Sequence, residues 1–148
     1  MKIFFTFLAI SFLSASSYAQ DTTNAEEKIK KVIEGETLAF ANADLVAWSG
    51  YFVHKPYLRW SVSATMFFDG WDALYNGAKA FLESQSGRKD ACGLHQITRN
   101  DWNIHISGNT AWVKFVQVSD TEPTPTQQFR VLENNNGKWE IAMLVALH

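Results

Sequence analysis

The C-terminal segment restricts the fold of this chain most, because it reads as a β-strand that is apolar on both faces. It follows Asn136-Gly137, a dipeptide that strongly indicates a two-residue β-hairpin. Strand alternation gives two apolar sets, Trp139, Ile141, Met143, Val145 and Leu147 on one face and Ala142, Leu144 and Ala146 on the other. Such a strand needs a covering layer on each side. We expect helices on the first face and a second subunit on the other.

The first 19 residues have the order of features found in a secretory signal peptide. Lys2 precedes an apolar run over residues 3–13, and small residues flank Tyr18 as signal peptidase requires. The run is too short for a transmembrane helix. The other interpretation is an amphipathic or buried helix of the domain. We favour the signal peptide, and expect a mature chain from Gln20 that is periplasmic or secreted and has no membrane association after cleavage.

The composition indicates that the fold is stabilised by side-chain packing rather than by charge interactions or disulfide bonds. It carries 13 basic and 15 acidic residues with no basic cluster, which argues against nucleic acid as a partner, since phosphate neutralisation dominates that affinity. The single cysteine, Cys92, cannot form an intrachain disulfide. The four histidines show neither an i, i+4 pair nor a Cys/His cluster, so we expect no metal site and no cofactor.

Helical and strand periodicities follow one another in a simple order along the chain. The polar residues 20–24 are expected to be irregular. Apolar spacing then predicts a helix over roughly 25–40, a second that starts at Asp44, a good N-cap, and a third over 71–84. Strands are predicted at 57–63, in the short run before Gly70, at 94–106 with a bulge near Asn100, and at 111–119, 127–133 and 138–147. Helices that precede the main sheet indicate an α+β fold.

Four stretches in this order resemble the nuclear-transport-factor-2-like superfamily of cone-shaped, cystatin-like α+β domains. They are FANADLVAWSGYF, LRWSVS followed by FFDGWDAL, ISGNTAWVKF and NNNGKWEI. The superfamily includes SnoaL-like polyketide cyclases, ketosteroid isomerase and scytalone dehydratase. The resemblance spans residues 25–148 and implies three N-terminal helices packed in the concave face of a curved, mostly antiparallel six-stranded sheet. It also implies a pocket inside the cone and, as in many members, a homodimer.

Aromatic residues of the helices and strands are the predicted lining of this pocket, namely Trp48, Tyr51, Phe52, Trp60, Phe67 and Trp139. We therefore expect a small apolar molecule as a partner. The homodimer is expected on the opposite sheet face, through Trp112, Val116 and Leu144, because soluble monomers seldom leave so large an apolar patch in water.

Four polar residues are candidates for acid–base chemistry. His54 and Tyr57 lie between the second helix and the first strand, where a histidine could be a base and a tyrosine an oxyanion donor. Asp69 and His95 could act as bases if they point inward. Each has a structural alternative: an exposed connection for His54, pocket wall for Tyr57, a turn role for Asp69, and a satisfied or exposed ring for His95.

These candidates do not reproduce the complete acid–base set of ketosteroid isomerase or of epoxide-hydrolysing members. The sequence therefore favours an exported domain that binds a small apolar ligand or serves as a dimeric interaction module. The alternative is a cofactor-free isomerase, dehydratase or cyclase that uses a His or Asp base with a Tyr donor. An open cavity with two titratable groups in reach of each other would favour the enzyme, and a cavity lined only by aromatic residues would favour binding.

Overall fold

The computed structural model describes residues 10–85, 96–119 and 124–147, with side chains in the first helix from Thr22 onward. The helices are α1 (Ile10–Ala41), α2 (Leu45–Ser49) and α3 (Trp71–Ser84). The strands are β1 (Arg59–Ser61), β2 (Phe67–Asp69), β3 (Ile97–Ser107), β4 (Thr110–Ser119), β5 (Thr126–Asn135) and β6 (Lys138–Leu147). This order of elements confirms the predicted α+β class.

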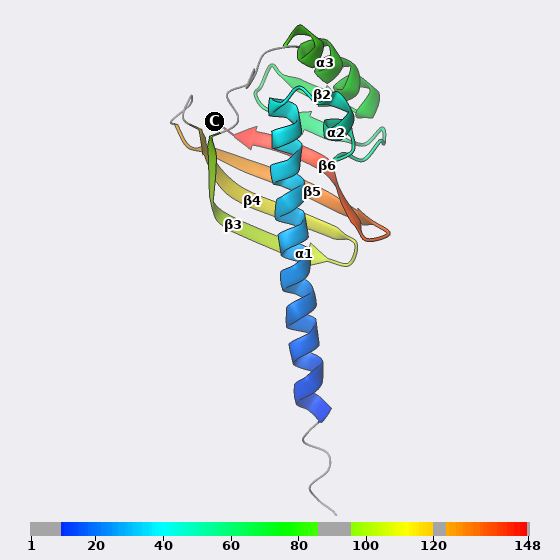
Figure 1. Cartoon of the computed structure of the whole chain (residues 1–148), viewed down its shortest axis with the longest axis vertical. Helices are drawn as coiled ribbons and strands as arrows, with labels where there is room; N and C mark the ends of the chain where they lie inside the picture. The colour runs from blue at the N-terminus through cyan, green and yellow to red at the C-terminus, as the bar shows by residue number, and fades with distance from the viewer. Residues whose placement is uncertain (1–9, 86–95, 120–123, 148) are drawn as a thin grey trace, which may run out of the picture.

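Helix α1 crosses one face of the sheet and extends beyond its edge (Figure 1). Its buried stripe includes Ile29 and Ile33, because residues three and four apart lie on the same side of a helix. The helix also runs through residues 20–24, which corrects the expectation of an irregular segment there. That stretch is polar but holds neither proline nor glycine, so nothing in it interrupts a helix.

The link from α1 to α2 is a tight helix-to-helix turn. Ala43 adopts a positive φ of 55°, and the N–H of Asp44 donates to the carbonyl of Ala39 at 2.9 Å, the long hydrogen bond of a Schellman motif. The Asp44 carboxylate then accepts a hydrogen bond from the Ala47 N–H at 2.9 Å. Asp44 is therefore the N-cap of α2, as predicted, and it fixes the direction in which α2 leaves α1.

Two helical glycines that weaken the predicted helices allow aromatic rings to approach closely. A Cβ atom on Gly35 of α1 would lie 2.3 Å from the Tyr51 hydroxyl oxygen, and one on Gly77 of α3 would lie 2.5 Å from the Phe68 ring. No side chain fits at either distance. The two glycines therefore hold α1 against the end of α2 and α3 against β2.

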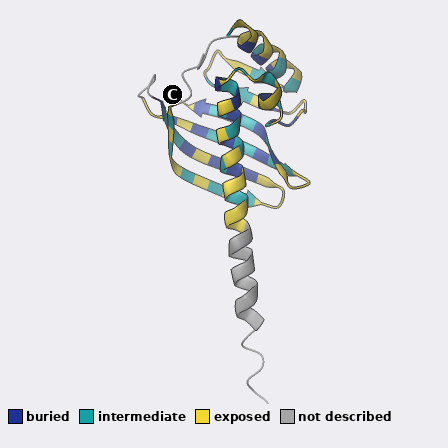
Figure 2. Ribbon diagram, in the orientation of Figure 1, coloured by how far each residue is buried: buried dark blue, intermediate teal, exposed yellow. Residues whose placement is uncertain are grey.

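The described strands form one open, mixed sheet with the order β2-β1-β6-β5-β4-β3. β1 runs parallel to β6 and every other pairing is antiparallel, which confirms a mostly antiparallel six-stranded sheet. The predicted bulge in β3 lies between Asn100 and Asn103, where Asp101 has a φ of 55°. Buried and exposed bands alternate along the strands (Figure 2), as one-sided covering by helices requires.

A bulge in β6 changes which side chains face the helices. Val131 of β5 pairs with Met143, but the next residue, Leu132, pairs with Ile141, so Ala142 is an extra residue in β6. Trp139 and Ile141 point to the core, as predicted. After the bulge the alternation reverses, so that Leu144 points inward and Met143 outward. The expectation that Leu144 belongs to a dimer interface is therefore wrong: it is 4% exposed and lies on the helix side.

The outer face of the sheet carries a group of apolar side chains on β4, β5 and β6. Trp112 stacks on Phe129 with ring centroids 6.4 Å apart and on His105 at 5.4 Å. Val116 lies on the same face as Trp112, as predicted. The inversion in β6 adds Met143 to this face in place of Leu144. We call these residues, with Val131 and Val145, the outer apolar face; Trp112 is 40% exposed and the other apolar members are partly buried.

The predicted signal peptide falls partly outside the described residues. Residues 1–9 are not described, and residues 10–19 form the first turns of α1. Across the described ranges, no helix combines the length and the apolar character needed to cross a membrane.

Candidate functional site

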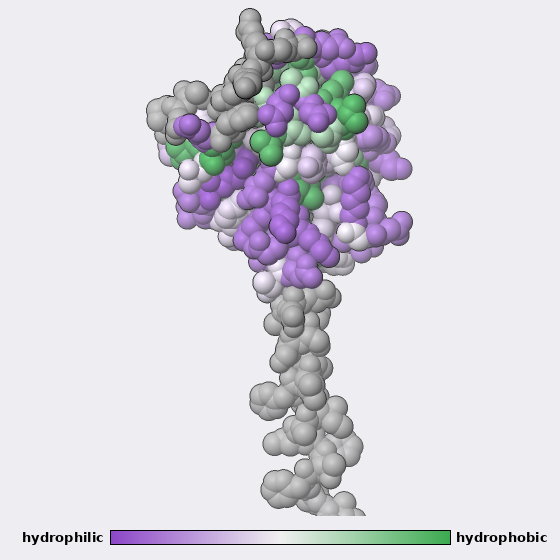
Figure 3. All heavy atoms as spheres, in the orientation of Figure 1, coloured by the Kyte–Doolittle hydropathy of each residue, from purple (hydrophilic) through white to green (hydrophobic). Residues whose placement is uncertain are grey.

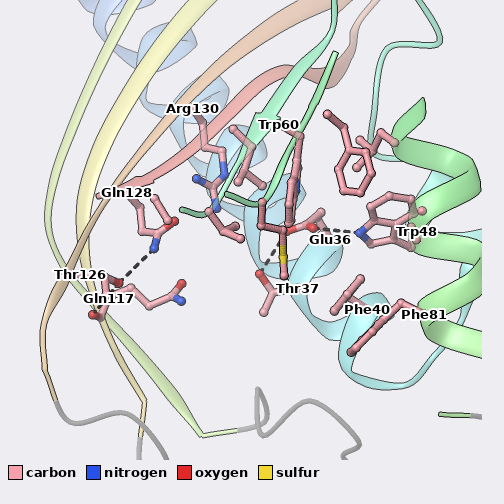
Figure 4. A pocket seen from close by; sticks show the side chains of 18 residues that line it. Glu36, Thr37, Phe40, Trp48, Trp60, Phe81, Gln117, Thr126, Gln128 and Arg130 are labelled. Atoms are coloured by element: carbon pink, nitrogen blue, oxygen red, sulfur yellow. Dashed lines mark hydrogen bonds between the residues drawn. The ribbon is translucent and has the colours of Figure 1, made fainter. Parts of the chain in front are cut away.

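The helices and the sheet enclose a cavity of about 590 Å³, within the size range of small-molecule sites. Its walls come from α1, α2, α3, the β1–β2 hairpin, the C-terminal halves of β4 and β6 and the N-terminal half of β5 (Figure 4). Met66 and Phe81 line the cavity and are also 53% and 44% exposed, so they mark where it meets solvent. On the face seen in Figure 3, apolar side chains gather around α2 and α3, whereas the region below them is largely hydrophilic.

One wall of the cavity is aromatic and aliphatic. Phe40 of α1 stacks on Phe81 of α3 with ring centroids 5.6 Å apart and planes 6° apart, and it also contacts Trp48 at 5.9 Å. Trp60 and Phe68 close the wall at the β1–β2 hairpin, 5.6 Å apart. These rings gather because α1 and α3 direct a side chain toward the cavity about once per helical turn, and the hairpin strands do so at every second residue.

The opposite wall is polar and comes from the sheet. Gln117 of β4 and Thr126, Gln128 and Arg130 of β5 point into the cavity from neighbouring strands (Figure 4). The Gln128 amide donates to the Thr126 hydroxyl at 3.0 Å, and Thr126, Gln128 and Arg130 are all at least 94% buried. A cavity with one apolar wall and one polar wall suits a molecule that is itself amphipathic.

Glu36 is the carboxylate that lines the cavity, and it is only 6% exposed. One of its oxygens accepts a hydrogen bond from the Trp48 indole N–H at 2.9 Å. The other lies 3.3 Å from the Thr37 hydroxyl, whose single proton also has the Ile33 carbonyl within 3.0 Å. The second oxygen therefore competes with the Ile33 carbonyl for the Thr37 proton.

Arg130 carries a buried positive charge with incomplete hydrogen bonding. Its side chain is 4% exposed and points from β5 into the cavity (Figure 4). One terminal nitrogen donates to the carbonyls of Phe129 at 3.0 Å and Val145 at 3.5 Å, but Nε has no partner in the described part of the chain. Burial lowers the pKa of Arg130 to about 10, an effect that Glu36 opposes and Arg99 reinforces. The guanidinium therefore stays charged at neutral pH.

Arg99 of β3 adds a second positive charge behind the polar wall. Its guanidinium donates to the Thr37 hydroxyl at 2.7 Å and to the Gln117 side-chain oxygen at 3.2 Å. Arg99 and Arg130 both lie over the Phe115 ring, at 5.7 Å and 5.5 Å from its centroid. Burial lowers the pKa of Arg99, while the charges of Glu36 and Glu34 raise it.

Two of the six aromatic residues predicted to line the pocket do so, Trp48 and Trp60. Phe52 is buried in the core beside Trp48 instead, and Phe67 is 60% exposed because its neighbour Phe68 takes the inward position on β2. Tyr51 and Trp139 line a separate, more open hollow between α1 and the β5–β6 turn. Aromatic rings do line the cavity, but four of the six residues named from the sequence lie elsewhere.

Three of the four acid–base candidates lie outside the cavity, and His95 lies outside the described residues. His54 is exposed, stacks on Trp71 at 3.9 Å and shares a hydrogen bond with the Ser49 carbonyl at 2.9 Å. Tyr57 is half-exposed and donates to Glu133 at 2.8 Å, a hydrogen bond that raises the pKa of the phenol. These partners explain why neither side chain turns toward the cavity.

Asp69 forms an ion pair with Arg59 at 3.0 Å on the outside of the β1–β2 hairpin. His54, Tyr57 and Asp69 therefore have three different sets of partners, and the structure does not bring them together. In the described part of the chain, no three His, Cys, Asp or Glu side chains lie close enough to hold a metal ion.

Glu36 and Arg130 carry the charge of the cavity, and the sequence reasoning missed both. A signal for each was present. Glu36 continues the buried stripe of α1, three residues after Ile33 and four before Phe40. Arg130 has the same strand parity as Leu132, a core residue of β5. A charged residue at a core position of a helix or strand is a recognisable candidate for a site.

Comparisons with known proteins support the fold and leave the site open. Neither a protein-family model nor a curated protein sequence matches this chain. Similar solved structures include a protein from Streptomyces avermitilis of the nuclear-transport-factor-2-like family that is proposed to be a dehydratase, with a TM-score of 0.67 and 12% identity. The match covers 85% of this chain and 96% of that one.

Two further structures show the same likeness at low identity. A protein from Novosphingobium aromaticivorans proposed to be a scytalone dehydratase matches with a TM-score of 0.62 and 16% identity, over 86% of each chain. An uncharacterised protein with a cystatin-like fold from Caulobacter vibrioides matches with a TM-score of 0.57 and 13% identity, over 82% of this chain and 87% of that one. Identities this low carry information about the fold alone.

Proposed function

The chain has the fold of nuclear-transport-factor-2-like proteins, and on this fold we propose that it binds a small, largely apolar molecule in the cone cavity. The observation that supports this most is an open space of about 590 Å³ in a region where the chain could have packed its own rings. The aromatic residues on one wall are already held by one another, as the Phe40–Phe81 stack shows. The aromatic wall is therefore preformed, which lowers the entropic cost of binding.

The test compares two tryptophan substitutions on one helix. Ala78 of α3 lines the cavity and is 6% exposed, so Ala78→Trp places an indole inside it. Ala80, two residues on, is exposed on the outside of the same helix, so Ala80→Trp adds the same ring without touching the cavity. N-phenyl-1-naphthylamine, a neutral fluorescent probe, reports binding in an apolar site.

We expect the probe to bind the wild-type chain and the Ala80→Trp variant with the same affinity. It should bind the Ala78→Trp variant at least about tenfold more weakly, because the new indole ring occupies the probe's site. Both variants should keep a cooperative unfolding transition. Equal probe binding by the two variants would place the probe elsewhere on the surface and would contradict the proposal.

A second candidate function is suggested by the position of Glu36. This carboxylate is buried in the same cavity as the Arg130 guanidinium, so the site pairs a group that can accept a proton with one that can stabilise an anion. The activity would be that of a cofactor-free isomerase or dehydratase, with Glu36 rather than His54 or Asp69 as the base. Exchange of solvent deuterium into a panel of small ketones, followed by NMR, tests it. Glu36→Gln should slow any such exchange by about 10²-fold or more, and an unchanged rate would remove Glu36 from this role.

We also propose that the outer apolar face pairs with the same face of a second copy. Val131 and Met143 lie opposite each other near its centre, and Trp112 provides an exposed ring that a partner could cover. Val131→Asp would put two unpaired charges at the two-fold axis, which a buried interface does not tolerate. Light scattering should give a dimer for the wild type and a monomer for the variant. A monomeric wild type at tens of micromolar would exclude this pairing.

Export of the mature chain is likewise a proposal, and it rests on the charge, apolar run and small residues of the first 19 positions. N-terminal sequencing of protein from the exported fraction should begin at Gln20. A chain that keeps Met1 in that fraction would contradict cleavage after Ala19.

A further inference from the structure

Glu36 and Arg130 are the charged residues on the described lining of the cavity. Arg99 stands behind the polar wall, where the charges of Glu36 and Glu34 favour its guanidinium. Glu36 forms no ion pair with either arginine; its nearest described donor is the Trp48 indole. Arg130 is therefore buried without an ion-pair partner among the described residues, an arrangement that is costly unless something else supplies the anion.

The uncompensated group is Arg130 rather than Arg99. Arg99 has two side-chain hydrogen bonds and lies nearer to solvent. Arg130 is 96% buried and donates to two backbone carbonyls from one terminal nitrogen, while Nε has no described partner. Buried donors without partners are rare in folded proteins and call for an explanation. Arg130 points into the cavity (Figure 4), and because Nε itself is shielded from water, a molecule bound there accepts from Nε after a small turn of the guanidinium.

The planar guanidinium and the aromatic wall restrict the class of anion that the cavity can bind. A guanidinium presents its N–H groups in a planar fork, which matches the two oxygens of a carboxylate better than it matches a single oxygen atom. Arg130 carries a single positive charge without an ion pair, so a monoanion would neutralise it, whereas a phosphate monoester would bring more negative charge than Arg130 can neutralise. The wall opposite Arg130 consists of the stacked Phe40 and Phe81 rings with Trp48, which suits the apolar part of the same molecule (Figure 4).

We infer that the ligand of this cavity is an amphipathic monocarboxylate, whose carboxylate pairs with Arg130 and whose aromatic or aliphatic body lies against the aromatic wall. This inference rests on the proposed function, because it names the class of molecule that the same cavity takes. It assigns Arg130 a specificity role: the residue selects acids over neutral molecules of the same shape. The Gln117 and Gln128 side chains, on the same wall, are placed to contact the head group.

A matched pair of ligands tests the inference in the wild-type chain. 1-Naphthylacetate and 1-naphthylacetamide have the same ring and nearly the same shape, and differ in a charged carboxylate against a neutral amide. Each is titrated as a competitor of N-phenyl-1-naphthylamine. We expect the acid to bind at least about tenfold more tightly than the amide, as charge-assisted hydrogen bonds are roughly twice as strong as neutral ones.

Three arginine variants test whether Arg130 causes the preference for the acid over the amide. Arg130→Met removes the charge with little change in volume and should bring the two affinities together. Arg130→Lys keeps a charge without the planar fork and should retain part of the preference. Arg59→Met removes an exposed arginine that pairs with Asp69 outside the cavity, and should leave the preference unchanged.

The outcomes separate this inference from the function on which it rests. Equal affinities of acid and amide in the wild type, or a preference that persists in the Arg130→Met variant, would overturn the monocarboxylate assignment. If the neutral probe still binds in those experiments and is still blocked by Ala78→Trp, the cavity remains a small-molecule site of another specificity. Loss of probe binding altogether would overturn both.

Discussion

Replacement of Arg130 by methionine should stabilise the ligand-free protein, because the folded state holds this charge in an unfavourable place. Burial lowers the pKa of Arg130 well below its ordinary value, to about 10. A lowered pKa in the folded state means that the charged form is less stable there than in the unfolded chain. At 1.36 kcal/mol per pKa unit, the charge costs about 3 kcal/mol at neutral pH.

The interactions that the substitution removes offset part of this gain. The hydrogen bond to the Phe129 carbonyl at 3.0 Å contributes about 1 kcal/mol. The cation–π contact with the Phe115 ring at 5.5 Å contributes about 1 kcal/mol. Methionine fills similar space and packs well on an aromatic ring. The net expectation is therefore a gain of about 1 kcal/mol, or roughly 3–6 °C in Tm for a chain of this size.

Urea unfolding followed by tryptophan fluorescence measures this gain, on protein that has been refolded from urea to remove any co-purified ligand. Arg130→Lys serves as the control, because it keeps a buried charge and should show no gain. Addition of 1-naphthylacetate should raise the unfolding midpoint of the wild type and leave that of Arg130→Met unchanged, since only a ligand that binds the folded state stabilises it. An Arg130→Met variant less stable than the wild type would refute the reasoning, because it would show that the guanidinium is already satisfied.

Three further substitutions test the packing and the hairpin. Gly77→Ala should lower the unfolding midpoint despite the higher helix propensity of alanine, because its Cβ would lie 2.5 Å from the Phe68 ring; a raised midpoint would mean that the ring yields freely. Trp139→Ala should cost about 3–5 kcal/mol in urea unfolding; an unfolding midpoint that barely moves would contradict the inward position of Trp139. Burial raises the pKa of Glu140, but hydrogen bonds and charge from its hairpin neighbours outweigh it and hold the pKa below its usual value. The stability that Glu140 contributes should therefore be present above the pKa of the unfolded state and disappear as the pH falls through the lower pKa of the folded state. The difference in unfolding free energy between the wild type and Glu140→Gln should accordingly shrink on acidification from pH 6 to 3.

Much of the fold could be predicted because its signals are local. The third helix, predicted over residues 71–84, has the same bounds in the structure. The Asn136-Gly137 hairpin forms with positive φ at both residues, 55° and 91°. The Asp44 cap depends on a hydrogen bond that spans three residues. Each of these features follows from a few neighbouring side chains, and none depends on what lies across the molecule.

The strand faces could be predicted only as far as the first irregularity. The alternation of β6 is correct for Trp139 and Ile141 and inverted from Met143 onward, because Ala142 is an extra residue relative to β5. A bulge is a property of the pairing between two strands, and the sequence of one strand does not reveal it. This single residue moved Leu144 from the predicted dimer face to the cavity wall.

The site is harder to predict than the fold, because the chemistry of a polar side chain does not reveal whether it occupies a buried position of a periodic pattern. His54 and Tyr57 have reactive side chains but lie in the exposed connection after α2. Glu36 and Arg130 lie at buried positions in a helix and a strand, 94 residues apart in the chain. They line the same cavity only because α1 packs on the sheet. A search for charged residues at core positions would have found both.

The central claim is that an acid bound in the cavity contacts Arg130, and the Nε–H resonance of this arginine in a ¹H–¹⁵N spectrum reports on that contact directly. In the free protein this N–H is buried without a described acceptor. The resonance is assigned by its absence from the Arg130→Lys spectrum. Titration with 1-naphthylacetate should shift it progressively downfield to saturation as the carboxylate becomes its acceptor, while 1-naphthylacetamide has a much smaller effect. An Nε–H resonance that stays in place while the acid saturates the protein would contradict the claim.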